Sequence, residues 1–214
     1  HRFAAPGPHF GQVAVDQADD LEADNVRRFS LDISGRVGAV LVRGPSSGGA
    51  MDPGSALQVA LDPYAGAPLP WSVRLQTVAL DEFGEGSLAG ARVVFFADVP
   101  GFTPQQAGAV ERFVRQGGSA VFFLGANVNA EEYNLRFLQS IAEHGGLLPG
   151  RIGQPAGNVG VTAAAVRLAK NLTHAYLAGL YDTPSDYPEV LVQRYYRLAA
   201  GPAGLESILS APAG

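Results

Sequence analysis

The chain has no cysteine, and it also lacks other features that would narrow its function. Without cysteine there are no disulfide bonds, no thiolate metal ligands and no cysteine nucleophile. No apolar run approaches the roughly 18 residues that a membrane-spanning helix needs. The first residue, His1, is not a methionine, and no signal peptide follows it. We therefore expect a piece of a longer protein, and we expect that this piece does not itself insert into a membrane.

Charge is also scarce in this chain. Charged residues make up 16% and hydrophobic residues 47% of its 214 residues, and the formal net charge is −5. These proportions are typical of a packed globular protein and exclude a disordered one. Because no basic stripe is present, the sequence argues against a nucleic-acid partner.

The clearest pattern lies between residues 92 and 143. Two apolar runs, 92–99 and 120–124, are rich in β-branched and aromatic residues. Between them, Thr103 is followed by the proline and glutamine of a helix start with a capping box. Asn129, with a glutamate three residues later, repeats the capping signal for a helix that reaches 144. Two buried strands joined by an amphipathic helix predict a βαβ unit in a parallel sheet that is covered on both faces.

The rest of the chain extends this unit on both sides. We predict further strands at 37–42, 72–80 and 188–198, helices at 55–61 and 172–180, and mostly loop over 147–161. The predicted fold class is α/β, with a flavodoxin-like, doubly wound and mainly parallel sheet and helices on both faces. Residues 1–34 form a short β arm ahead of this sheet, and residues 35–214 form the α/β domain.

One motif at the end of the first core strand has a formal enzymatic match. The stretch Gly44–Gly48 fits G-x-S-x-G, with Ser46 in the place of the nucleophile. A nucleophile elbow requires the helix to begin at once, but glycines and a proline up to Gly54 delay it. The same loop lacks the lysine of a phosphate-binding loop. We therefore interpret it as a flexible loop and assign no catalytic residue.

The histidines do not suggest a metal site. His1, His9, His144 and His174 are scattered and follow no metal-binding spacing. His144, at the end of its predicted helix, complements the helix dipole and needs no further role. We expect no bound metal and no cofactor.

Candidate ligand-binding residues follow from topology alone. In a doubly wound sheet, ligands bind beyond the carboxyl ends of the strands. This rule places five polar residues around one crevice: Ser46, Ser47, Asp98, Asn127 and Asn129.

The order of these motifs resembles the class I glutamine amidotransferase-like fold. More narrowly, it resembles the soluble domain of bacterial membrane proteins related to the aerotolerance-type BatA group, which carry membrane segments on either side. The resemblance is carried by Asp24-Asn25, Arg28-Phe29, Ala39–Val42, Ala97–Pro100, Gly117-Gly118, Val121–Gly125, Leu147–Pro149 and Arg194–Tyr196. It implies that the arm is the end of a preceding β-sandwich domain.

The resemblance also implies where a nucleophile would stand. In amidotransferases of this fold, the cysteine follows a central strand at the start of a helix. The matching stretch here is Leu124–Asn127, with Ala126 or Asn127 in the place of the cysteine. Neither can attack a carbonyl, and no His-x-Glu pair lies near the C-terminus. The resemblance thus implies the fold without its chemistry.

Three hypotheses remain open at this point. The first is a non-catalytic binding or assembly module of a bacterial membrane-associated protein, periplasmic or extracytoplasmic, whose partners are other protein domains of that assembly. The second is a hydrolase or a carbohydrate-binding enzyme that uses Ser46 or Asp98 in the crevice. The third is a structural domain that self-associates through an exposed strand at 189–198.

Overall fold

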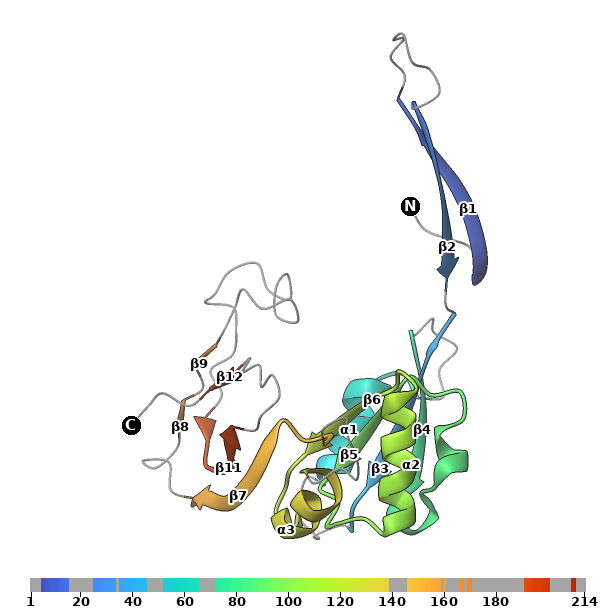
Figure 1. Cartoon of the computed structure of the whole chain (residues 1–214). Coiled ribbons are helices and arrows are strands. Elements are labelled where there is room, and N and C mark those ends of the chain that lie inside the picture. The colour runs from blue at the N-terminus through green and yellow to red at the C-terminus, as the bar shows by residue number, and fades with distance from the viewer. Residues whose placement is uncertain are drawn as a thin grey trace.

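The computed structural model shows an α/β body, a β hairpin ahead of it and short antiparallel strand pairs after it (Figure 1). It describes residues 5–15, 25–33, 35–45, 52–65, 72–138, 146–158, 160, 166–167, 169–170, 191–200 and 209–210. All structural statements below refer to these residues.

A parallel four-stranded sheet forms the centre of the body. Its strands are β3 (Val37–Arg43), β4 (Val73–Ala79), β5 (Val93–Ala97) and β6 (Ser119–Phe123), in the order β4-β3-β5-β6. The α/β class with a mainly parallel sheet is therefore confirmed. β4, which is less apolar than the other three strands, lies at an edge.

The register aligns the carboxyl ends of all four strands. Arg43 on β3 pairs with Ala79 of β4 on one side and with Ala97 of β5 on the other, and Ala97 pairs with Phe123 of β6. The loops after the four strands therefore leave the sheet at one edge and lie close together. This edge is where the sequence places its candidate residues.

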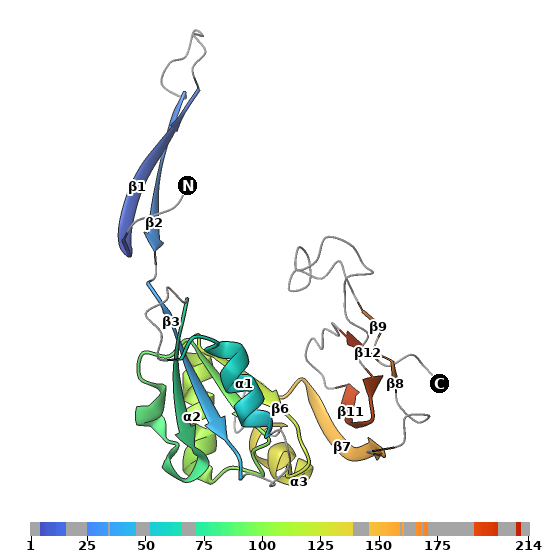
Figure 2. The same cartoon turned by 180° about the vertical axis from the view of Figure 1, so that it is seen from behind.

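Two helices cover the opposite faces of the sheet. α1 (Pro53–Leu61) lies on one face and α2 (Pro104–Arg115) on the other, as the two opposite views show (Figures 1 and 2). The predicted capping box of α2 is present, because Thr103 Oγ1 accepts from Gln106 N at 3.2 Å and Thr103 N donates to Gln106 Oε1 at 3.0 Å. Asp52 caps α1, which the sequence analysis did not predict.

Aromatic side chains fill the core between the sheet and the helices that follow β5 and β6. Phe96 stacks on Phe122 at 5.1 Å between ring centroids, and Phe102 meets Phe96 and Phe137 edge-on at 5.0 Å. Tyr133 is fully buried in the same cluster. Each such ring contributes about 1.5–3 kcal/mol through burial of apolar surface, so this cluster fixes the loops after β5 and β6 against the sheet.

The helix predicted from Asn129 is shorter in α geometry than the sequence indicates. α3 spans Ala130–Tyr133, and the next five residues, Asn134–Leu138, form a π-helical turn. The change begins at Asn134, which is buried and exchanges two hydrogen bonds with the backbone of Ile152, at 2.8 and 2.9 Å. Single π turns of this kind interrupt α-helices where a local contact competes with the helix. Residues 139–145 lie outside the described part of the chain.

The loop predicted over 147–161 is wrong, because most of it is a strand. β7 (Gly150–Gly157) pairs antiparallel with β11 (Arg194–Ala200), with an irregularity between Tyr196 and Leu198. Glycine and proline weaken a central strand but are tolerated in a two-stranded ladder, where proline needs no ladder bond on its open side. Tertiary pairing thus overrides the local turn signals.

The remaining strands of the C-terminal third are short. β8 (Val166–Arg167) pairs with β10 (Leu191–Val192), and β9 (Ala169–Lys170) pairs with β12 (Leu209–Ser210). The strand predicted at 188–198 corresponds to β10 and β11. The helix predicted at 172–180 lies outside the described residues.

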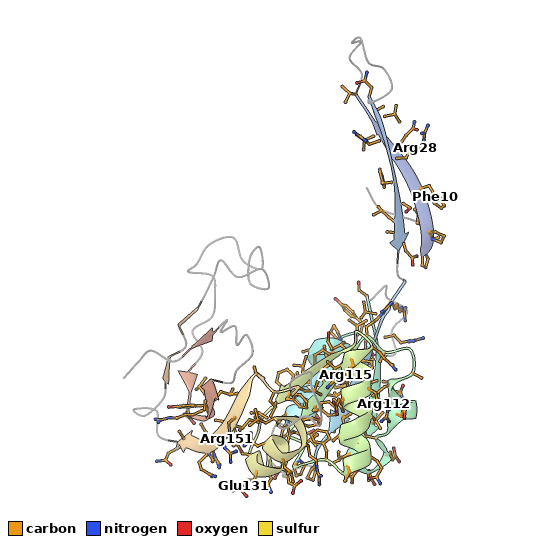
Figure 3. The ribbon with its side chains drawn as sticks, in the orientation of Figure 1. Phe10, Arg28, Arg112, Arg115, Glu131 and Arg151 are labelled. Carbon is orange, nitrogen blue, oxygen red and sulfur yellow. The ribbon has the colours of Figure 1, made fainter. Side chains whose placement is uncertain are left out.

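The arm is an antiparallel hairpin of β1 (Gly7–Ala14) and β2 (Val26–Ile33). It extends away from the sheet, with Phe10 and Arg28 projecting from it (Figure 3). Phe10 is 82% exposed and Val13 62% exposed. A two-stranded hairpin is marginally stable alone in water, so the arm differs sharply from the buried sheet.

Candidate functional site

A cleft of about 840 Å³ opens at the carboxyl edge of the sheet. Its walls come from the ends of β3, β4 and β5, the start of α2 and the segment after β6: Arg43, Gly44, Pro45, Ala79, Leu80, Asp81, Pro100, Gly101, Phe102, Thr103, Pro104, Gln106, Asn129, Glu132 and Arg136. β4 and β5 flank β3 on its two sides, so the order of the strands reverses at this point. Ligands of open α/β sheets bind at such reversals.

Most polar groups in the cleft wall already have partners within the chain. Gln106 Nε2 donates to the carbonyl oxygens of Leu80 at 2.8 Å and Phe83 at 3.3 Å, while its Oε1 accepts from Thr103. Asn129 Oδ1 accepts from the backbone N–H groups at the start of α3. These groups hold the wall in place, and the surface that remains for a ligand is mainly apolar.

Arg43 is held at the N-terminus of α1. Its guanidinium pairs with Asp52, the residue that caps this helix, and donates to Ser55 Oγ at 3.1 Å. Partial burial alone would raise the pKa of Asp52, but hydrogen bonds from Ser55 and Arg43 together hold it below its usual value. An anion would bind at a free helix N-terminus, and here the Asp52 carboxylate already occupies that position.

Three other charged residues line the cleft, namely Asp81, Glu132 and Arg136. Arg136 Nε is buried and makes no hydrogen bond within the described part of the chain, and it lies 3.6 Å from Glu132 Oε2, beyond hydrogen-bonding range. Its side chain is 29% exposed and that of Glu132 is 41% exposed. Asp81, beyond β4, is exposed. The cleft therefore has an arginine and a glutamate on the α3 side and an aspartate on the β4 side.

Asp98 lies next to this cleft but does not line it. It follows β5 with a φ of 50°, in the left-handed region, and is only 5% exposed. Its carboxylate accepts two hydrogen bonds from Asn127, from the backbone N–H at 2.8 Å and from Nδ2 at 2.9 Å. Asn127 Nδ2 also donates to Pro45 O at 3.3 Å. Together, these bonds join the loops after β3, β5 and β6.

Two glycines, Gly44 and Gly125, pack closely against Asp98. A Cβ atom at Gly44 would meet the Asp98 carbonyl group, and one at Gly125 would meet its carboxylate. Both neighbouring loops therefore need glycine at these positions. The Asp98 carboxylate thus packs closely against Gly125, and its backbone carbonyl packs closely against Gly44.

Two tyrosines complete the fixation of the loop after β6. Tyr133 donates to Val99 O at 2.8 Å, and Tyr196 on β11 donates to the carbonyl oxygens of Gly125 at 3.1 Å and Val128 at 3.2 Å. Burial raises the pKa of Tyr133 above its usual value, and the nearby charge of Asp98 adds to the effect. Tyr133 therefore stays neutral and acts as a hydrogen-bond donor.

The five site residues predicted from the sequence do not all line the cleft. Asp98 and Asn127 come together, as the topology predicts, but they bind each other. Asn129 lines the cleft and caps α3. Ser46 and Ser47 lie outside the described residues.

Ala126, where the sequence resemblance puts the nucleophile position, lines a second hollow of about 350 Å³. Gln154, Arg194 and Tyr196 lie among the residues on its far wall. Residues of the loop after β6 and of the β7–β11 pair thus line the same hollow.

Sequence reasoning missed the charged residues of the cleft. Arg43 is the last residue of an apolar strand, which is a usable signal for a side chain at the carboxyl edge. Glu132 and Arg136 are four residues apart, a spacing that predicts an ion pair on a helix. For Asp81, the only indication of a place in the cleft was its position after a predicted strand.

Neither a metal-binding cluster nor a membrane-spanning helix is present in the described ranges. Within them, no three histidine, aspartate or glutamate side chains gather closely enough to hold a metal ion. Within the same ranges, every helix falls short of the length and apolar content needed to cross a membrane.

Comparison of the chain with protein-family models, with curated proteins and with solved structures finds no match in any of the three.

Proposed function

We propose that this domain is a non-catalytic binding module whose ligand occupies the cleft at the carboxyl edge of the sheet. The observation that carries the proposal is the pair of hydrogen bonds from Asn127 to the Asp98 carboxylate. They tie up the two polar side chains next to the place where an enzyme of this architecture would carry its nucleophile.

The chemistry of the loop supports this proposal. A general base must come within hydrogen-bonding reach of a proton on the substrate. Asp98 is 5% exposed and uses both carboxylate oxygens within the chain. Ala126, the neighbouring residue, has no nucleophilic atom. The cleft beside this loop, in contrast, is open and mainly apolar, which suits binding of a ligand.

We further propose that the fold is flavodoxin-like and related to the class I glutamine amidotransferases. Its support is the strand order β4-β3-β5-β6, in which the first core strand lies between the second and the third. The parent protein, in this proposal, is a bacterial membrane-associated protein with the domain outside the cytoplasm, and its partners are other protein domains of the assembly. That part rests on the sequence resemblance.

Two measurements test the proposed function. The first assays hydrolysis of glutamine and of p-nitrophenyl acetate by the wild type and by Ser46→Ala and Asp98→Asn variants. We expect no turnover by the wild type, and turnover that either substitution abolishes would contradict a non-catalytic role. The second follows the amide ¹H–¹⁵N spectrum while the neutral apolar probe 4-phenylbutan-1-ol is added.

The expected result of the second measurement is a set of shifts confined to the cleft wall. Amides of Gly44, Leu80, Gly101 and Phe102 should move, and amides on the outer side of α2 should not. The absence of any shift in the cleft wall at millimolar probe would contradict the proposed binding site.

A further inference from the structure

We propose that the cleft ligand carries a carboxylate on an apolar body and that Arg136 binds this carboxylate. The inference rests on the proposed function, because it names the chemical class of the ligand for the same cleft. It is carried by three features of the cleft wall: an arginine without a hydrogen bond to any described residue, an apolar surface beside it, and a helix N-terminus that a carboxylate already caps.

Arg136 is the cation in the cleft with donors to spare. Arg136 makes no hydrogen bond to any described residue. It forms an ion pair with Glu132, but the distance of 3.6 Å between Nε and Oε2 is too long for a hydrogen bond. Its Nε is buried, while the side chain as a whole is 29% exposed and lines the cleft, so the proposal places the ligand at the exposed part of this side chain. A guanidinium recognises a carboxylate through a planar pair of donors. Glu132 is 41% exposed and can turn to water when a ligand arrives.

Arg43, the other arginine that lines the cleft, is less able to bind a ligand carboxylate. Arg43 pairs with the carboxylate of Asp52 and donates to Ser55, and Asp52 caps α1. An added anion at this position would have to displace a carboxylate that already has three hydrogen-bond donors around it. The charge pattern therefore favours an acid group on the α3 side of the cleft and argues against a phosphate on the α1 side.

The wall between the charged groups is apolar. Pro45, Leu80, Pro100, Phe102 and Pro104 contribute to it. An alkyl or aryl group beyond the carboxylate would cover part of this surface, and each buried CH₂ group contributes about 0.8 kcal/mol.

Asp81 sets the direction of the ligand. It lies beyond β4, and two strand spacings of about 5 Å each separate β4 from β5. A carboxylate near Asp81 would be repelled, so the acid group lies toward Arg136 and the apolar body lies toward Leu80.

The test compares a carboxylate with its neutral counterpart. 4-Phenylbutyrate and 4-phenylbutan-1-ol are titrated separately into ¹⁵N-labelled protein at pH 7 and low salt, and dissociation constants are taken from the amide shifts. The variants are Arg136→Gln, Glu132→Gln and Arg43→Gln. Arg112→Gln is the matched control, because Arg112 pairs with Glu85 on the exposed side of α2 and does not line the cleft (Figure 3).

For the wild type we expect the acid to bind about tenfold more tightly than the alcohol, the size expected of a charge-assisted hydrogen bond at a partly exposed site. Arg136→Gln should remove this preference and leave binding of the alcohol unchanged, which also shows that the variant is folded. Glu132→Gln should tighten binding of the acid, because a competing carboxylate is removed. Arg112→Gln and Arg43→Gln should retain the preference.

The possible failures are distinguishable. If both probes shift the cleft amides with equal affinity, or if Arg136→Gln keeps the preference for the acid, the ligand class is wrong while the cleft remains a binding site. If Arg43→Gln alone removes the preference, the acid lies on the α1 side and the assignment to Arg136 is overturned. If neither probe shifts the cleft amides, the proposed function itself fails, and the inference fails with it.

Discussion

The carboxyl edge of the sheet has two neighbouring regions that use polar residues in opposite ways. In the first region, Asn127 after β6 donates to the Asp98 carboxylate after β5, and Tyr196 on β11 donates to the backbone of the loop after β6. Beside them, the ends of β3, β4 and β5 and the segment after β6 surround an open cleft, with Arg136 and Asp81 in its walls. We call the first the closed side, defined by these three residues together with Tyr133, and the second the cleft.

This difference shows why polar residues at strand ends are poor evidence for catalysis on their own. A buried carboxylate must have hydrogen bonds, and the nearest donors belong to the adjacent loop. Asp98 therefore stabilises the sheet edge that forms one boundary of the cleft. Arg136, which has hydrogen-bond donors left for a ligand, is not among the site residues predicted from the sequence.

The largest expected effect comes from breaking the closed side at Asp98. Asp98→Ala should lower the free energy of unfolding by about 3 kcal/mol, because the partly buried Asn127 N–H loses its acceptor and alanine is disfavoured at positive φ. Urea denaturation followed by circular dichroism measures this change.

Asp98→Asn is the matched control for that variant. Asparagine tolerates positive φ and keeps one oxygen for the Asn127 N–H, so the loss should be clearly smaller than for alanine. Equal stability of the wild type and the alanine variant would mean that the closed side does not hold the sheet edge.

A smaller effect is expected where β11 meets the closed side. Tyr196→Phe removes the donor to Gly125 and Val128 and should lower the free energy of unfolding by about 1 kcal/mol. Thermal unfolding measures it. A matched Tyr195→Phe variant, on the same strand but without a described hydrogen bond to that loop, should change stability by less.

Stability at high pH should report on Tyr133. Because its pKa is raised in the folded state, its contribution is fully present below about pH 10, the usual pKa of tyrosine, and is lost as the pH rises above that value. Urea titrations at pH 9 and pH 11 measure the loss. In Tyr133→Phe the slope over this interval should be flatter, and an unchanged slope would show that Tyr133 does not cause it.

The smallest effect is expected on the cleft side, at Asp52. Its pKa is below the usual value in the folded state, so its stabilising contribution is present at neutral pH and is lost as the pH falls below about 4. Because the pair with Arg43 is partly exposed, the contribution is a fraction of 1 kcal/mol. Asp52→Asn should flatten the acid limb of the stability curve slightly. A loss comparable to that of Asp98→Ala would mean that the two sides do not differ as described.

The sequence predicts the framework of this edge well. Alternating and continuous apolar runs locate all four strands of the sheet, and Thr103 and Asn129 mark their helix starts correctly, because these signals are local. The sequence also predicts that the candidate residues lie at the carboxyl edge, because parallel strands bring their carboxyl ends together.

The sequence does not predict which polar groups bind each other. Asp98 and Asn127 are 29 residues apart, and Tyr196 lies a further 69 along the chain, so their contacts depend on the packed loops. β7 was missed for a similar reason, since its glycines and proline are overridden by pairing with a strand far along the chain. The free donors of Arg136 appear only once its neighbours are placed.

The most direct test of the difference between the two sides is hydrogen exchange at the Asn127 amide. This amide lies in a loop but donates to a buried carboxylate, so we expect exchange about 100-fold or more slower than in an unstructured peptide. Addition of 4-phenylbutyrate should leave its protection unchanged, while amides of the cleft wall shift. Fast exchange at Asn127, or protection that appears only with the ligand, would contradict the account, because the closed side would then be open and part of the binding site.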